Sequence, residues 1–289
     1  MEPSNILIYL HIPKTAGTTL NSILKREYGK KRTITIDQAD FQKSVSELGE
    51  STLKSRRKGM LINVEHSAFG IHRSISCPST YVTILRDPIA RVISHYYYVR
   101  AVKDNSLHDF IESRHMSLEE FVTSGLTRET DNGQIRQLTD AYDVPFGQCT
   151  DTLLNQAIDN INNHFSFVGL TEFFDQSLIS MCELYGWRKY PVYVKRLRNK
   201  NKPIVSAIPD RTIEIIRKQN DLDCRLYYYV KSGFGKICSP EFIGKTKRFQ
   251  RINLVYCAIK KPIALQNSLH RPIVKKLETF IKSHRTNNQ

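Results

Sequence analysis

The sequence predicts an α/β protein in which helices cover both faces of a central, mostly parallel sheet, a three-layer α/β/α arrangement. Short apolar runs that read as buried strands are the first observation. Amphipathic stretches with helical spacing between these runs are the second. Strands that alternate with helices indicate a parallel sheet with helical crossovers. The expected strands are residues 6–12, 60–64, 81–85 and 165–170.

The expected helices follow these strands along the chain. Asp87 and Pro88 form a strong helix start, with Asp as the N-cap and Pro at the first helical position. The apolar residues behind them recur at the spacing of one helix face, to about residue 102. We expect further helices from residue 18 and at 41–53, 118–122, 153–161, 174–185, 209–219 and 221–231.

Length and composition favour a globular protein of one main domain. The chain has 289 residues, of which 40% are hydrophobic. No apolar run reaches the roughly 18 residues of a transmembrane helix, and the N-terminus lacks the basic start of a signal peptide. We therefore expect a cytoplasmic protein. Six scattered cysteines without a CxxC pair predict reduced thiols and no metal site.

The positive charge is concentrated at the C-terminus. The net charge is +15, and residues 245–289 hold eleven Lys and Arg against a single acid, Glu278. We divide the chain into a domain of residues 1–240 and a basic extension of residues 241–289. Such an extension predicts contact with an anionic surface, either membrane headgroups, an acidic glycan or nucleic acid. A solvated extension without a partner is an equal alternative.

Residues 6–20 have the pattern of a phosphate-binding loop. An apolar strand leads into a Lys/Thr/Gly turn, and a helix begins directly after it. At such a junction backbone N–H groups converge, the helix N-terminus is positive and a lysine adds charge. The alternative is an ordinary strand–turn–helix with exposed polar residues. The candidate anion-binding residues are Lys14, Thr15, Ala16, Gly17, Thr18 and Thr19.

Two other strand ends carry chemically useful residues. Arg86 ends a strand and Ser94 lies two turns into the next helix, so together they can grip a second phosphate; a local pair between Arg86 and Asp87 is the alternative. His66 ends another strand beside Glu65, and an imidazole pKa of about 6.5 suits a general base. Ligands bind parallel sheets outside the C-terminal strand ends. We expect Lys14, His66 and Arg86 at one edge.

A phosphotransferase of the P-loop class fits the sequence less well. The pattern G-x-x-x-x-G-K-S/T is absent, and Lys14 precedes the glycine. No convincing acidic ligand for Mg²⁺ ends a neighbouring apolar strand.

Taken together, these segments resemble the carbohydrate sulfotransferases that use 3′-phosphoadenosine 5′-phosphosulfate (PAPS), most closely the branch of heparan sulfate 2-O-sulfotransferase and its bacterial relatives. Residues 11–20 look like the 5′-phosphosulfate loop and residues 85–97 like the 3′-phosphate motif. Residues 65–70 resemble the segment with the catalytic base. Residues 131–138 and 167–173 resemble two later blocks. The motifs occur in the family's order.

The resemblance implies a sulfotransferase with a P-loop-like fold that moves a sulfuryl group from PAPS to a carbohydrate hydroxyl. It implies that Lys14 and the loop bind the 5′-phosphosulfate, that Arg86 and Ser94 bind the 3′-phosphate, and that no metal is needed. His66 would be the base, with Arg136 and Glu65 at the acceptor and residues 195–202 closing over the nucleotide.

Three departures from the family pattern bear on these roles. Glu65 stands where the family has glycine, Ala16 replaces a frequent glycine, and Ile135 replaces a threonine beside Arg136. A kinase-like enzyme and a non-catalytic anion- or glycan-binding protein remain alternatives. Uronic acid, hexosamine, glycolipid sugar and protein tyrosine all remain open as acceptors.

Overall fold

The computed structural model describes residues 6–37, 59–65, 68–75, 77–194, 205–234 and 239–260. In this part of the chain five strands form one sheet in the order β2-β3-β1-β4-β5, and every neighbouring pair is parallel. The predicted α/β class with a parallel central sheet is therefore confirmed. The strands are β1 (Ile6–Leu10), β2 (Thr33–Asp37), β3 (Leu61–Glu65), β4 (Ser79–Leu85) and β5 (Phe165–Leu170).

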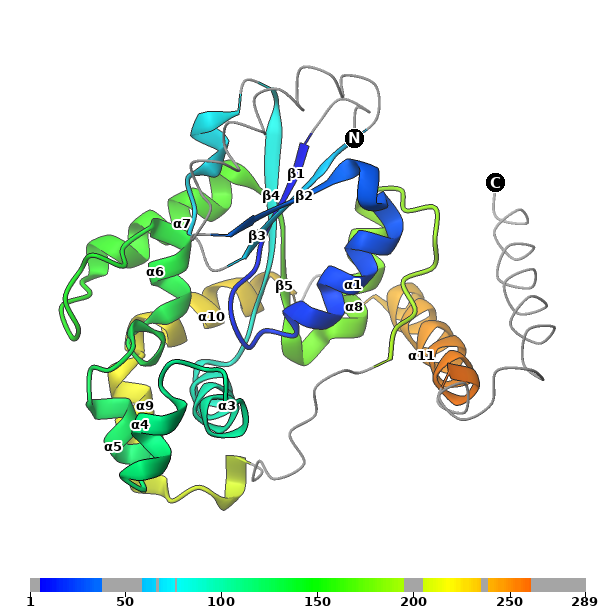
Figure 1. The fold of residues 1–289 in the computed structure, drawn as a ribbon. Coiled ribbons are helices and arrows are strands. Elements are labelled where there is room, and N and C mark those ends of the chain that lie inside the picture. Colours follow the sequence, from blue (N-terminus) through cyan, green and yellow to red (C-terminus); the bar gives the residue numbers. More distant parts are fainter. Residues whose placement is uncertain are drawn as a thin grey trace.

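Helices cover both faces of the sheet (Figure 1). One face carries α1 (Gly17–Tyr28), α8 (Phe174–Leu184) and α11 (Pro240–Lys260). The other carries α6 (Gly133–Thr139), α7 (Asp151–His164) and α10 (Asp221–Phe234). Side chains alternate between the faces of a strand, so a strand buried on both sides is apolar at every position. This explains the continuous apolar run at β1, which is buried throughout.

A third helical cluster lies beyond the C-terminal ends of the strands, at the bottom of Figure 1. In the first helix of this cluster, Pro88 occupies the first turn, as predicted. The side chain of Asp87 accepts a hydrogen bond from the Ala90 N–H. The cluster comprises α3 (Pro88–Ala101), α4 (His108–Ser113), α5 (Leu118–Thr123) and α9 (Asp210–Gln219). Short 3-10 turns connect elements at Lys30–Arg32, Ile71–Ser74, Arg128–Thr130, Thr171–Phe173 and Val205–Ala207.

The sequence missed β2 at the sheet edge and the helix α11. The Thr-Ile alternation of β2 is only five residues long and lies in a polar stretch. The helix expected at 41–53 lies outside the described residues.

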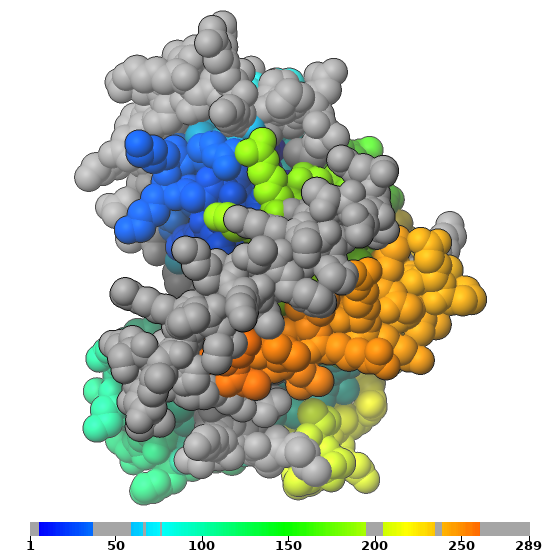
Figure 2. All heavy atoms as spheres, turned by 90° about the vertical axis from the view of Figure 1, so that its right-hand side faces the viewer, coloured from blue at the N-terminus to red at the C-terminus, as the bar shows by residue number. Residues whose placement is uncertain are grey.

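The helix α11 is part of the folded domain. Its Phe249 is fully buried in the core that α1 and α8 share, and its Lys245 pairs with Glu183 of α8. Figure 2 shows α11 in orange across the side of the molecule that also presents α1 in blue. The predicted boundary at residue 241 therefore falls inside packed structure. None of the helices in the described ranges, α11 included, is long and apolar enough to cross a membrane.

Candidate active site

A cavity of about 510 Å³ opens at the C-terminal ends of the central strands. Residues that follow β1, β4 and β5 line it, which is where an open parallel sheet binds ligands. Its volume lies within the range of small-molecule sites. The cavity brings together seven of the residues predicted to bind phosphate: Lys14, Ala16, Gly17, Thr18, Thr19, Arg86 and Ser94.

The loop between β1 and α1 turns through two left-handed residues. Lys14 and Ala16 both have a φ of 68°, a conformation that is costly for residues with a Cβ. Thr15 lies between them, fully buried, and its hydroxyl donates to the Ile12 carbonyl at 2.8 Å. The Thr15 hydroxyl thus holds the loop together, and Thr15 is not among the residues that line the cavity. The first N–H groups of α1 lack partners within the helix and carry its positive dipole.

Gly17 is needed because of a neighbouring ring. A Cβ at this position would lie 1.7 Å from Nε2 of His11. The His11 ring is stacked on Tyr9, with centroids 5.6 Å apart, and it lines the cavity. The His11 ring by itself therefore requires a glycine at this position.

Lys14 and Arg86, which were predicted to bind two different phosphate groups, are in direct contact. Nη1 of Arg86 donates to the carbonyl oxygen of Lys14 at 2.9 Å. Nζ of Lys14 lies 3.6 Å from the ring centroid of Tyr98 on α3, a cation–π distance. Lys14 and Arg86 therefore present two cations to one cavity.

Arg86 is largely buried, and burial lowers the pKa of its guanidinium, while Glu172 and Asp87 act in the opposite direction. An arginine remains charged under these conditions. Its Nε is buried and has no hydrogen-bond partner among the described residues. An unpartnered buried donor beside a cavity is the feature that an anionic ligand would satisfy.

A further wall of the cavity comes from segments to which the sequence assigned no site residue. Asp175, in the first turn of α8, accepts from the Tyr193 hydroxyl at 2.7 Å and from Nε2 of Gln250 at 3.0 Å. Glu172 lies in the motif at residues 167–173, which could have pointed to it. No motif pointed to Gln250, because its segment was interpreted as an extension of the domain. The lining residues of this wall are Thr171, Glu172, Phe174, Asp175, Gln176, Tyr193 and Gln250.

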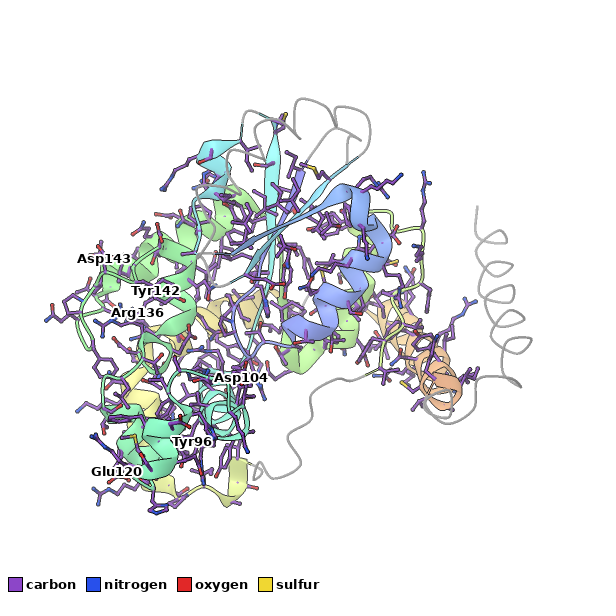
Figure 3. The ribbon with its side chains drawn as sticks, viewed as in Figure 1. Tyr96, Asp104, Glu120, Arg136, Tyr142 and Asp143 are labelled. Atoms are coloured by element: carbon purple, nitrogen blue, oxygen red, sulfur yellow. The ribbon has the colours of Figure 1, made fainter. Side chains whose placement is uncertain are left out.

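Arg136 disagrees with its predicted role at the acceptor. Its side chain is fully buried, and Figure 3 labels it at α6. The guanidinium pairs with the carboxylate of Asp131. It also donates to the carbonyl oxygens of Asp131, Ala141, Val144 and Pro145. Every bond is internal, so Arg136 braces the chain from 131 to 145.

The remaining predicted residues lie at or beyond the limits of the description. Glu65 ends β3, where its carboxylate accepts from the side-chain amides of Asn21 and Asn63; it is not among the residues that line the cavity. His66, the predicted base, lies outside the described residues, as does the basic stretch at 195–202.

The fold and the cavity define an α/β protein with a cavity at the C-terminal ends of its strands, to which Lys14 and Arg86 contribute positive charge. Residues 1–251 match the family model described as galactose-3-O-sulfotransferase, and the chain belongs to this family. The predicted resemblance to carbohydrate sulfotransferases is thereby confirmed.

Individual relatives are similar at moderate identity. Galactosylceramide sulfotransferase of Bos taurus is 25% identical over 255 residues, which cover 81% of this chain and 57% of the relative. Heparan-sulfate 6-O-sulfotransferase 1 of Homo sapiens is 25% identical over 283 residues, 81% of this chain and 66% of the relative. Heparan sulfate 2-O-sulfotransferase hst-2 of Caenorhabditis elegans is 28% identical over 112 residues, 34% and 33%. The chain thus spans only part of these relatives, 57% of the bovine protein.

Proposed function

We propose that this protein is a PAPS-dependent sulfotransferase that acts on a hydroxyl group of a carbohydrate. The observation that carries the proposal is one cavity that is lined both by Lys14 and the N-terminus of α1 and by Arg86 and Ser94. PAPS carries phosphate groups at both the 3′ and the 5′ position of its ribose, so its binding needs two anion sites. The unpartnered Nε of Arg86 supports the fit.

Each residue group has a distinct task in this proposal. When bound, PAPS supplies an activated sulfuryl group on its 5′-phosphate. Lys14 and the N–H groups at the start of α1 hold that phosphate and stabilise the negative charge that grows on it when the S–O bond breaks. Arg86 and Ser94 hold the 3′-phosphate. A base takes the proton of the acceptor hydroxyl as the new O–S bond forms, and adenosine 3′,5′-bisphosphate (PAP) leaves.

Two histidines are candidates for the base. His66 follows β3, the strand beside β1, and keeps the role proposed from the sequence. His11 is a second candidate, because its ring lines the cavity next to the Lys14 loop. An imidazole near its ordinary pKa can accept a hydroxyl proton at neutral pH.

The acceptor class is proposed from the names of the relatives. Their names refer to galactose, galactosylceramide and heparan sulfate, so we propose a carbohydrate hydroxyl without choosing the sugar. Contact of the basic extension, residues 241–289, with an anionic surface (membrane headgroups, an acidic glycan or nucleic acid) stays a prediction, as does the cellular location. We find no group of three or more metal-ligating side chains within the described ranges.

Calorimetric titration with PAP, compared with ATP plus Mg²⁺, tests the proposal. We expect PAP to bind at least tenfold more tightly, since only PAP engages both anion sites. Preference for ATP with Mg²⁺ would favour the kinase-like alternative. PAP binding without sulfuryl transfer to any sugar acceptor would favour the non-catalytic alternative.

The same preparation assigns the base. We expect substitution of the true base by alanine to abolish turnover while PAP affinity stays within a few-fold of wild type. His66→Ala and His11→Ala serve as each other's control. Unchanged turnover in His66→Ala would remove the sequence-based assignment.

A further inference from the structure

Gln134 holds both main-chain polar groups of Arg86. Its Oε1 accepts from the Arg86 N–H at 2.9 Å, and its Nε2 donates to the Arg86 carbonyl at 2.9 Å. The Gln134 side chain is almost completely buried. A side-chain amide that pairs with both groups of one residue fixes the position and direction of that residue's backbone.

The backbone at Gln134 is itself held by a buried residue of α10. It lies in the first turn of α6, where the carboxylate of Asp223 accepts from the N–H of Gln134 at 3.1 Å and of Ile135 at 2.9 Å. Asp223 is fully buried, and Nη2 of Arg91 lies 3.7 Å from its Oδ2. The backbone N–H of Gln134 is thus held by a buried carboxylate in the interior.

Arg86 passes this constraint on to the phosphate loop. Gln134 binds the main chain of Arg86, whereas the Arg86 side chain lines the cavity. Its Nη1 donates to the carbonyl oxygen of Lys14 at 2.9 Å. Lys14 has a left-handed φ of 68°, which needs support from its surroundings. One continuous path of hydrogen bonds therefore runs from Asp223 through Gln134 and Arg86 to the loop.

We propose that Gln134 is a positioning residue that aligns the 3′-phosphate arginine with the 5′-phosphosulfate loop. This inference rests on the proposed function, because it concerns the same two anion sites. Gln134 acts only through Arg86 and touches no ligand. A side chain that merely filled the interior would contribute to stability and leave the preference for a 3′-phosphate unchanged.

The test compares PAP with adenosine 5′-monophosphate, which lacks the 3′-phosphate, by calorimetry on the full chain. Gln134→Met keeps the size of the side chain and removes both hydrogen bonds. We expect it to weaken PAP binding by about tenfold, near the upper end of what a typical hydrogen bond contributes, because Arg86 is no longer held in place. Binding of the monophosphate should weaken less, so the advantage of PAP over the monophosphate falls.

Two controls separate positioning from stability. Thr139→Val removes a buried hydroxyl from the same helix, where it bonds to the Ile135 carbonyl, and should leave both affinities at wild-type values. In an Arg86→Ala background, Gln134→Met should have no further effect on PAP, because the positioned group is gone. Gln134→Glu keeps the acceptor for the Arg86 N–H and replaces the methionine variant if that variant does not fold.

The outcomes distinguish this inference from the proposed function. Failure of the wild-type protein to bind PAP would remove the proposed function. Wild-type binding with an unchanged PAP advantage in the Gln134 variants would overturn the positioning role. An equal loss in the Arg86→Ala background would overturn it as well.

Discussion

The tightest constraint on a single residue in the site is the space next to Gly17. The imidazole of His11 occupies the position of a Cβ, with Nε2 only 1.7 Å away. Gly17 has no left-handed φ, so its requirement is one of space. By contrast, the adjacent position 16 has a left-handed φ of 68° but is occupied by alanine. A glycine, frequent here in the family, would suit this backbone, and alanine adopts the conformation at some cost in free energy.

Gly17→Ala should therefore displace His11 or the start of α1. We expect the variant to lose about 1–3 kcal/mol of unfolding free energy, typical of overpacking, and to bind PAP about tenfold more weakly, because loop and ring both line the cavity. Urea denaturation and calorimetry measure the two effects. The control is Gly233→Ala on α10, where an added Cβ meets no atom within 4 Å and where alanine should stabilise by about 0.5–1 kcal/mol. Equal behaviour of the two variants would contradict the role of His11.

Among the elements, α11 is the one whose importance the sequence concealed. Its inward positions include the polar Thr246 and Asn253, so the apolar stripe of a packed helix is interrupted. Asn253 accepts from the Tyr193 N–H at 2.7 Å, and Gln250 donates to Asp175. A helix that packs through specific hydrogen bonds leaves a weak periodic signal. Its many basic residues then made it look like part of a basic extension.

Phe249→Ala tests whether α11 is integral to the domain. Phe249 is 0% exposed, and deletion of a buried phenylalanine side chain costs about 3–5 kcal/mol. We also expect weaker PAP binding, because Gln250 lines the cavity. Leu254→Ala is the matched control on the same helix; Leu254 is 70% exposed, and its truncation should change stability by no more than about 0.5 kcal/mol. If the two variants are equally stable, α11 is a dispensable extension.

At the scale of the whole molecule, the sequence predicted most of the sheet and the position of the site. The strands β1, β3, β4 and β5 are visible in the sequence as short apolar runs because they are largely or partly buried. The two phosphate-binding motifs follow β1 and β4. The motif at 131–138 shows the limit of this reasoning. Arg136 looked like a ligand contact, yet it serves internal carbonyls, whereas Gln134 supports the site. Only the three-dimensional path of the chain decides which polar side chain of a motif faces inward.

A second whole-molecule property is the response of stability to acid, which depends on a buried histidine. His95 lies on α3 beside Phe121 of α5, and both ring nitrogens are buried without a hydrogen-bond partner among the described residues. The pKa of His95 is lowered to about 4, mainly by burial; Glu129 acts in the opposite direction, and Arg91 and Lys14 add to the lowering. In the unfolded chain an ordinary histidine has a pKa of about 6.5. The unfolded state therefore binds the extra proton between about pH 6.5 and pH 4.

The unfolding free energy should consequently be constant in this respect above pH 6.5 and fall as the pH drops toward 4. The full loss from His95 approaches about 3 kcal/mol, from about 1.4 kcal/mol per unit of pKa difference. Burial lowers the pKa of His72 as well, so part of the acid sensitivity belongs to that residue. We expect His95→Leu to keep near wild-type stability at pH 7.5 and to lose less of it at pH 5, as measured by urea denaturation at both values. A variant that loses stability with acid as steeply as wild type would show that His95 is already charged, or accessible to water, in the folded protein.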